Sequence, residues 1–497
     1  MFNLYCIYII KNYILVNEGN EQTLLIILNQ IDIEFLISIT NLLNKNNKKL
    51  SYDILYILIN ISYAENGEKL FALDEKIIIN IAKFLGNNKN DSTLLGCGIW
   101  LIKNITYLKE DTENESIEIF LHYKIINFFE EIYERHLLNI NFMTNLMSCL
   151  WNFIIYKLKN KNDILYLLPT IKIIKTQLRP NLISDILYKY VYLLYKLTSY
   201  NSSNIYYEMI NYKIHKELMN IYPFCSQRFE NINTKNIIQD EEYKKNLKDI
   251  ENYKNICLII LKILGKIMSL EDGILTQTLL DSGIAKFLNM VLQSHDITVI
   301  KNASFCISNI CAGTYGQISN LYDNNTLFEL IKVAKNIYEA LNYNGILKNE
   351  QYNKLKDAFR EINYVFSLTI INSIYEKSIP FARYDNFTVV LILLKGLDII
   401  ENNVELFRLI ISAIYRLLVY DRTDKYKDKN LKENNNNNNS NLEDNIQNLS
   451  ISEFMERNGI KEIAQKLKYS KIDDNTVRAF ENIYNEVFNE VEVEENL

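Results

Sequence analysis

The chain has 497 residues, of which 48% are hydrophobic and 23% charged, a composition typical of a protein that buries a core. Its formal charge of −6, from 54 Lys and Arg against 60 Asp and Glu, argues against a general nucleic-acid binder, because phosphate neutralisation needs clustered positive charge. Only 13 Gly and 4 Pro argue against β-sandwiches, β-barrels and glycine-rich phosphate loops, and favour helices.

The first segment, residues 1–16, is apolar, but it lacks a basic n-region and is interrupted by Lys11. It is therefore predicted to form a buried first helix rather than a signal peptide. No uncharged apolar stretch reaches the length of about 20 residues that spans a bilayer, so no membrane partner is expected. Seven scattered cysteines without a CxxC pair indicate neither a disulfide framework nor a zinc site, and favour a reducing compartment.

Apolar residues recur at i, i+3, i+4 and i+7 through most of the chain, which is the period of helices. Nine of the predicted helices share one frame, and asparagine recurs at a fixed position in it. That position falls at residues 60, 104, 152, 196, 266, 309, 368, 416 and 482. Most spacings lie between 43 and 48 residues. A unit of this length is typical of armadillo and HEAT arrays.

The three longest spacings each contain a polar insert, at residues 226–252, 342–353 and 423–448. These inserts are expected to project as loops or to be disordered, and the asparagine run 434–439 is predicted to be disordered. The sequence thus predicts an all-α armadillo-repeat solenoid, a right-handed superhelix of about nine or ten repeats over residues 1–497.

Three stretches carry a more specific signal than the repeat length. The stretch 263–321 resembles the sixth and seventh repeats of importin-α, including the helix TQTLLDSG and the turn ISNICAGTYGQI. The segment 96–106, GCGIWLIKNIT, resembles the Trp-x-x-x-Asn helix of that family, and residues 454–488 resemble its last repeat. The resemblance implies an adaptor of nucleocytoplasmic protein transport, expected in cytoplasm and nucleus.

In that family the aromatic residue and the asparagine, at i and i+4, lie on one face of the third helix of each repeat and line the concave groove. Stacked rings form slots for the stems of Lys and Arg, and the asparagine amide binds a peptide backbone. The groove binds basic nuclear localisation signals at a major and a minor site.

The resemblance assigns peptide-binding roles to residues of both sites. The major site would comprise Tyr56, Asn60, Trp100, Asn104 and Asn152. Asp111, flanked by Glu110, Glu113 and Glu115, would supply the anionic partner of a lysine, and the minor site would keep Phe305 and Asn309.

Several positions depart from the family pattern. Ser148 stands at an aromatic place, Lys196 and Lys266 bring positive charge to asparagine places, and Leu368 lacks an amide. For Trp100, Tyr56 and Phe305 the alternative is a packing role in the core, for the acidic loop it is simple solvation, and the off-frame Trp151 is predicted to be core.

Residues 1–45 contain only two basic residues, Lys11 and Lys45, so the basic helix with which the family binds importin-β is not seen and importin-β binding is not expected. The four histidines are far apart, and no GxGxxG or Walker sequence occurs, so no enzyme activity, cofactor or metal is predicted. The expected partners are protein or peptide segments, basic ones above all. The alternative function is a divergent armadillo scaffold with little or no signal binding.

Overall fold

The computed structural model describes residues 2–16, 31–44, 47–64, 66–107, 114–137, 139–160, 164–232, 241–270, 273–342, 348–399, 403–433, 449–467 and 474–488. Over these ranges the chain forms helices and turns, without strands. It divides into two compact units, Met1–Glu217 (unit 1) and Leu218–Leu497 (unit 2), and the boundary falls within helix α13 (Ile214–Ile232).

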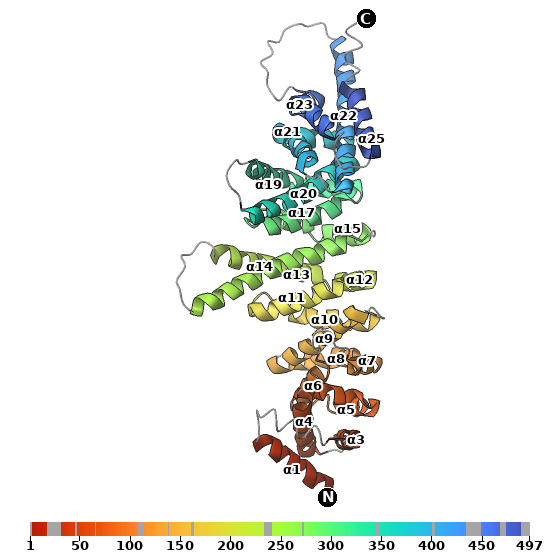
Figure 1. The fold of residues 1–497 in the computed structure, drawn as a ribbon, viewed down its shortest axis with the longest axis vertical. Helices are drawn as coiled ribbons and strands as arrows, with labels where there is room; N and C mark the ends of the chain where they lie inside the picture. Colours follow the sequence, from red (N-terminus) through yellow and green to blue (C-terminus); the bar gives the residue numbers. More distant parts are fainter. Residues whose placement is uncertain are drawn as a thin grey trace. The chain divides into compact units, whose positions relative to one another are not determined.

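The described residues of unit 1 form the α-helices labelled in Figure 1 and three 3-10 helices, which we call η1 to η3. These elements are α1 (Phe2–Val16), α3 (Ile33–Leu42), α4 (Lys48–Tyr63), η1 (Gly67–Ala72), α5 (Glu75–Asn87), α6 (Ser92–Ile105), α7 (Glu115–His122), α8 (Ile125–Ile132), η2 (Tyr133–His136), α9 (Ile140–Asn160), η3 (Ile164–Leu167), α10 (Pro169–Gln177), α11 (Ser184–Thr198) and α12 (Ser203–Asn211).

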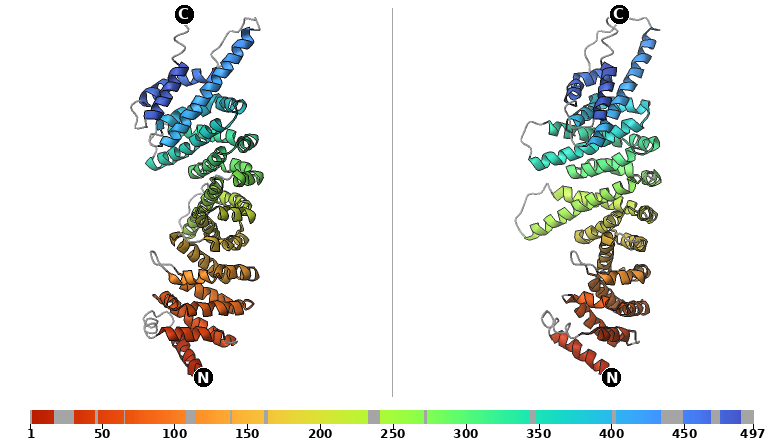
Figure 2. Two further views of the ribbon diagram at one scale, coloured as in Figure 1. Left: turned by 90° about the vertical axis from the view of Figure 1, so that its right-hand side faces the viewer. Right: turned by 45° about the vertical axis from the view of Figure 1, so that its right-hand side comes forward.

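Unit 2 continues the same pattern with longer helices (Figure 2). They are α14 (Glu241–Met268), α15 (Gly273–Asp281), α16 (Ile284–Val291), α17 (Ile297–Cys311), α18 (Tyr315–Asp323), α19 (Thr326–Leu341), α20 (Asn349–Asn372), α21 (Tyr375–Ile399), α22 (Val404–Glu433), α23 (Ile451–Arg457), α24 (Ile460–Leu467) and α25 (Asp474–Phe488).

The nine frame positions fall on α4, α6, α9 and α11 of unit 1 and on α14, α17, α20, α22 and α25 of unit 2. Each of these helices is the last and longest of its repeat, and we call them the third helices. In unit 1, α4 packs on α6, α6 on α9, and α9 on α11; in unit 2, α14 packs on α17, α17 on α20, and α20 on α22. Each repeat has three helices, and in two repeats the first helix is the short η1 or η3. Three helices per repeat distinguish armadillo from HEAT repeats. The predicted all-α armadillo solenoid is confirmed.

Local sequence explains where the third helices begin and what they bury. The N-cap Asp91 of α6 accepts hydrogen bonds from the backbone N–H groups of Thr93 and Leu94, and Asp296 caps α17 in the same way. Leu101, Ile102 and Ile105 of α6 are fully buried, and each such side chain contributes roughly 1.5–3 kcal/mol to the core.

A left-handed residue joins the first helix to the second in several repeats, a feature not predicted from the sequence. Positive φ angles occur there at Lys124, Lys213, Gly283, Asn325 and Gly459. In α21 three consecutive residues, Asp385, Asn386 and Phe387, are left-handed, so this element consists of two helices joined at a kink. In the sequence, the left-handed residue is often followed by isoleucine, as in Lys124-Ile125, and this recurring pair could have located these turns.

The polar inserts contain more helix than a loop prediction allows. Helix α13 runs to Ile232 and α14 begins at Glu241, so most of 226–252 extends two repeat helices, and α20 begins inside the insert 342–353. Helix α22 continues to Glu433, whereas the asparagine run 434–439 lies outside the described residues. Extending an existing helix requires no new nucleation, which explains helix in polar sequence.

The predicted first helix is α1, which packs against α4 through one face that includes the buried Ile7 and Ile14. Its other face is open, since Tyr8 is 61% exposed. Among the helices that the structure describes, none has the length and apolar character of a membrane span.

Candidate functional site

The third helices of unit 1 share one stripe of side chains at i, i+3 and i+4 spacing, which we call the aromatic face. All of its members are half-buried or exposed except Asn152, which is buried. Its members lie on the consecutive helices α4, α6, α9 and α11. They are Tyr52, Tyr56, Asn60, Trp100, Lys103, Asn104, Ser148, Trp151, Asn152, Tyr188, Tyr192, Tyr195 and Lys196.

Trp100 is the most open ring predicted to bind peptide. It is 45% exposed, whereas its helix neighbours Ile99 and Leu101 are fully buried. The alternative of a core role therefore does not describe Trp100. Tyr56, at the equivalent position of α4, is half-buried.

The frame asparagines link consecutive repeats. The Nδ2 of Asn104 donates to Ser62 Oγ at 3.2 Å and to the Ile59 carbonyl at 3.5 Å, at the end of α4. The Nδ2 of Asn152 likewise donates to Thr106 Oγ1 at 3.2 Å and to the Lys103 carbonyl at 3.3 Å. These bonds satisfy acceptors in the last turn of the preceding third helix.

Two asparagines vary this pattern. Asn309 Nδ2 donates to the carbonyl of Gly265 at 3.0 Å, on the preceding third helix α14, whereas Asn60 Nδ2 donates within its own helix to the Tyr56 carbonyl at 2.8 Å. An amide has two donor hydrogens and an acceptor oxygen. A peptide backbone would bind the amide groups that these hydrogen bonds leave unused. Their peptide-binding role stays a prediction.

Trp151 belongs to the aromatic face and not to the core, so its predicted core position is wrong. Ser148 is at the frame's aromatic place, and Trp151, three residues later on the same stripe, is half-buried. Its ring stacks on Tyr192 of α11 with centroids 5.4 Å apart and planes 23° apart, and Tyr188 and Tyr195 flank that tyrosine. The i, i+3 spacing from Ser148 was the signal that could have placed it.

The charged members of the aromatic face are lysines and not carboxylates. The Lys196 ammonium lies 5.0 Å from the centroid of the Tyr192 ring, and Lys103 Nζ donates to Asn145 Oδ1 at 3.3 Å. Asp111 lies outside the described residues. Glu115 begins α7, and Glu118 of the same helix binds Lys157 at 3.0 Å.

The predicted minor-site residues belong to unit 2. Phe305 is half-buried and packs over Gly265 of α14, where an added Cβ would come within 2.6 Å of the ring. Lys262 and Lys266 lie on α14 to either side of that glycine in sequence, and Leu368 is on α20. The structure thus brings together Tyr56, Asn60, Trp100, Asn104 and Asn152 on one face of unit 1, and Phe305 and Asn309 in unit 2.

The described residues contain no group of three or more His, Cys, Asp or Glu side chains that could hold a metal ion. Burial raises the pKa values of the thiols of Cys149, Cys306 and Cys311, which keeps them in the unreactive protonated form.

Neither a family model nor a curated protein matches the sequence. Among solved structures, an engineered protein from the Northeast Structural Genomics Consortium is 13% identical, with 96% of this chain and 93% of that chain covered and a TM-score of 0.55. A designed armadillo repeat protein in complex with the peptide (KR)4 is 16% identical, covering 64% of this chain and 99% of that chain with a TM-score of 0.39. A second designed armadillo repeat protein is 15% identical over 63% of this chain and 98% of that chain, also with a TM-score of 0.39. The first likeness agrees with the helical repeat fold.

Proposed function

We propose that this armadillo protein is an adaptor that binds an extended peptide segment along the aromatic face of unit 1. The observation that carries the proposal is the 45% exposure of Trp100 between Tyr56 on the preceding third helix and the Trp151–Tyr192 stack beyond it. Large aromatic side chains exposed on a rigid element are typical anchors of protein interfaces, because they bury much area and lose little entropy.

The ligand in this proposal is a basic segment of the nuclear localisation type, bound across residues 56–152 for transport between cytoplasm and nucleus. Support comes from the importin-α resemblance and from the acidic sequence around Asp111, beside α7 in the chain. Trp100 would contact the stem and charge of a lysine or arginine, with Asn104 beside it binding the peptide backbone.

The expected affinity is low. An exposed cation–π contact contributes about 0.5–1 kcal/mol and a hydrogen bond about 0.5–1.5 kcal/mol net. Ordering of the peptide opposes these terms. The described face also carries Lys103 on α6 and Lys196 on α11, and both charges repel a basic ligand.

A general armadillo scaffold is the second candidate, and the same lysines favour it, together with Ser148 at an aromatic place. A scaffold of this kind would bind a partner through tyrosine and tryptophan contacts without selecting basic residues. The two functions differ in charge preference rather than in the surface used.

The test is fluorescence anisotropy with three labelled ten-residue peptides of equal length, one rich in Lys and Arg, one with Glu in their place and one with Ser. The adaptor proposal predicts saturable binding of the basic peptide that weakens with added salt, and weaker binding of the other two. Equal binding of all three would support the scaffold function, and binding of none would contradict peptide recognition by this chain.

A further inference from the structure

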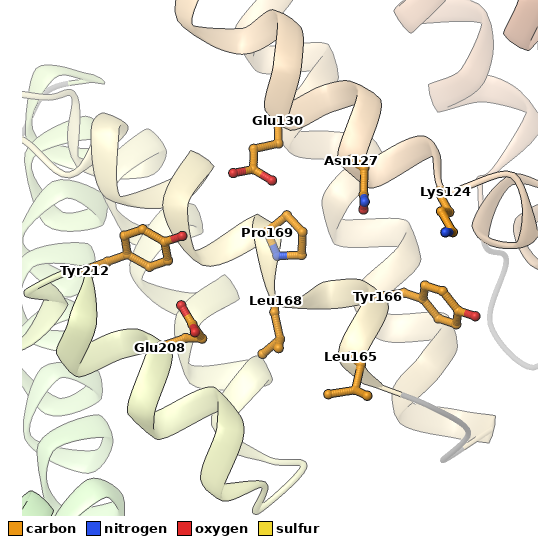
Figure 3. Close-up of a pocket in the computed structure, with 9 residues that line it drawn as sticks. All are labelled: Lys124, Asn127, Glu130, Leu165, Tyr166, Leu168, Pro169, Glu208 and Tyr212. Atoms are coloured by element: carbon orange, nitrogen blue, oxygen red, sulfur yellow. The ribbon is translucent and has the colours of Figure 1, made fainter.

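A pocket of about 360 Å³ opens in unit 1 between α8, the η3–α10 segment and α12 (Figure 3). The first helix of this repeat is reduced to η3, four residues long, whereas the first helices α7 and α12 have eight and nine residues. A gap beside α8 and α12 is the consequence of that shortening. None of the lining residues belongs to a third helix, so the pocket is separate from the aromatic face.

Three oxygen-bearing side chains meet at one end of the pocket. Figure 3 shows the carboxylates of Glu130 and Glu208 and the hydroxyl of Tyr212 turned toward the space beside Pro169. Burial and the negative charges of Glu208 and Glu130 raise the pKa of Tyr212, which is consistent with this proximity.

The carboxylates at this end are not fully neutralised. Glu130 Oε1 binds Lys172 Nζ at 3.1 Å, and Lys172 is also 3.9 Å from Glu134. Within the described ranges no Lys, Arg or His nitrogen forms an ion pair with Glu208. One half-buried carboxylate, that of Glu208, therefore faces the pocket without an ion-pair partner among the described residues.

The rest of the lining comprises two polar residues, Lys124 and Asn127, which Figure 3 shows on the side away from Glu208, and an apolar wall. Leu165, Tyr166, Leu168 and Pro169 form the wall that η3 and the start of α10 contribute, with Leu165 51% and Tyr166 38% exposed. This wall suits a hydrocarbon stem, and the oxygen cluster suits a positive charge at the end of that stem.

We propose that this pocket binds an organic cation on an aliphatic stem, with the chemistry of an arginine side chain. The guanidinium donates to the carboxylate of Glu208, and its planar face packs against Tyr212. The stem lies along Pro169 and Leu168. The negative end of the pocket excludes a carboxylate of the same length.

The direct test is ligand-observed saturation-transfer NMR on the full chain with butylguanidinium and, as its anionic counterpart, valerate. Butylguanidinium is expected to bind and valerate not to bind. Glu208→Gln keeps the size of the side chain and removes its charge, and it is expected to weaken butylguanidinium binding about five- to tenfold. Glu68→Gln, at another half-buried glutamate of unit 1 outside the pocket, serves as the matched control and should leave binding unchanged.

As a control for folding, the thermal unfolding midpoints of Glu208→Gln and Glu68→Gln are measured, and equal midpoints would establish that both variants are folded. Binding of valerate as tight as that of butylguanidinium, or an equal effect of the two substitutions, would overturn the proposal. Trp100→Ala should not change butylguanidinium binding, so the outcome is independent of peptide recognition on the aromatic face.

Competition distinguishes the two sources of this chemistry. If the tripeptide acetyl-Gly-Arg-Gly-amide displaces butylguanidinium at comparable concentration, the site receives an arginine side chain of a partner protein. If the tripeptide binds at least tenfold more weakly, the site is selective for a small free cation. Both results require the cation site, and the affinity of the tripeptide relative to butylguanidinium identifies which ligand occupies it.

Discussion

Trp100 and Phe305 occupy the same frame position, four residues before an asparagine, yet their surroundings differ. Trp100 is 45% exposed, whereas Phe305 is half-buried over Gly265. Trp100→Ala is therefore expected to weaken basic-peptide binding more than Phe305→Ala, as measured by anisotropy.

The order of the two substitutions should be reversed for stability, so that Phe305→Ala lowers the free energy of unfolding more than Trp100→Ala does. Phe305→Ala should lower the free energy of unfolding by roughly half of the about 3–5 kcal/mol that a fully buried ring loses. An equal loss of peptide binding in the two variants would show that Trp100 has no special role and would favour the scaffold function.

His215 on α13 is 2% exposed, and burial, with a smaller effect of the Lys216 charge, lowers its pKa to about 4. The unfolded chain binds a proton near pH 6.5 and the folded chain does not, so stability is lost as the pH falls from 6.5 toward 4. When the pH is lowered from 7.5 to 5.5, this histidine should reduce the free energy of unfolding by about 1.4 kcal/mol.

Denaturant unfolding of the wild type and of His215→Gln at the two pH values measures this loss. The variant should show a smaller decrease in unfolding free energy over that interval. Equal decreases would show that His215 is protonated as readily in the folded protein as in the unfolded chain.

At the scale of elements, the third helices are joined by asparagine hydrogen bonds. Asn152 is 7% exposed and binds groups at the end of α6, so Asn152→Ala leaves Thr106 and the Lys103 carbonyl without this donor. A loss of about 1–3 kcal/mol in unfolding free energy is expected. Asn60→Ala breaks a bond within one helix only and should cost less. A larger cost for Asn60→Ala would contradict the inter-repeat role.

The left-handed turns offer a second test of the repeat geometry. Gly283 has φ of +91°, and an added Cβ would meet no atom within 4 Å, so Gly283→Ala should cost about 1 kcal/mol through backbone strain alone. Gly96 lies inside α6 with equally open surroundings but no positive φ, and Gly96→Ala should stabilise the protein by about 0.5–1 kcal/mol. Thermal unfolding of the two variants should give shifts of opposite sign, and shifts of the same sign would refute this.

The repeat frame was predictable because it rests on periodicity. A helical apolar pattern and an asparagine at fixed phase located the third helices, and an intact Trp-x-x-x-Asn pair located Trp100. Trp151 was missed because it lies off the frame, although it shares a helix face with Ser148. The pocket arises from a shortened first helix and meets residues of α8 and α12, more than 70 positions apart, which no local pattern links.

At the scale of the whole molecule, the two compact units are built from the same kind of repeat but carry different side chains on their third helices. The aromatic face of unit 1 collects tyrosine and tryptophan on four consecutive third helices. In unit 2, Phe305 packs over Gly265 of α14 and Asn309 donates to the Gly265 carbonyl, and Lys262 and Lys266 lie on the same helix.

Binding of a basic peptide to the aromatic face of unit 1, as proposed, has a built-in reporter. The chain contains two tryptophans, Trp100 and Trp151, and both lie on that face. The most direct measurement is tryptophan emission during titration with a basic peptide that lacks aromatic residues, repeated with Trp151→Phe so that Trp100 alone reports. A saturable shift of the Trp100 emission to shorter wavelength is expected, with the midpoint found by anisotropy, because the peptide covers an exposed indole. Peptide binding in anisotropy without any change in tryptophan emission would contradict it.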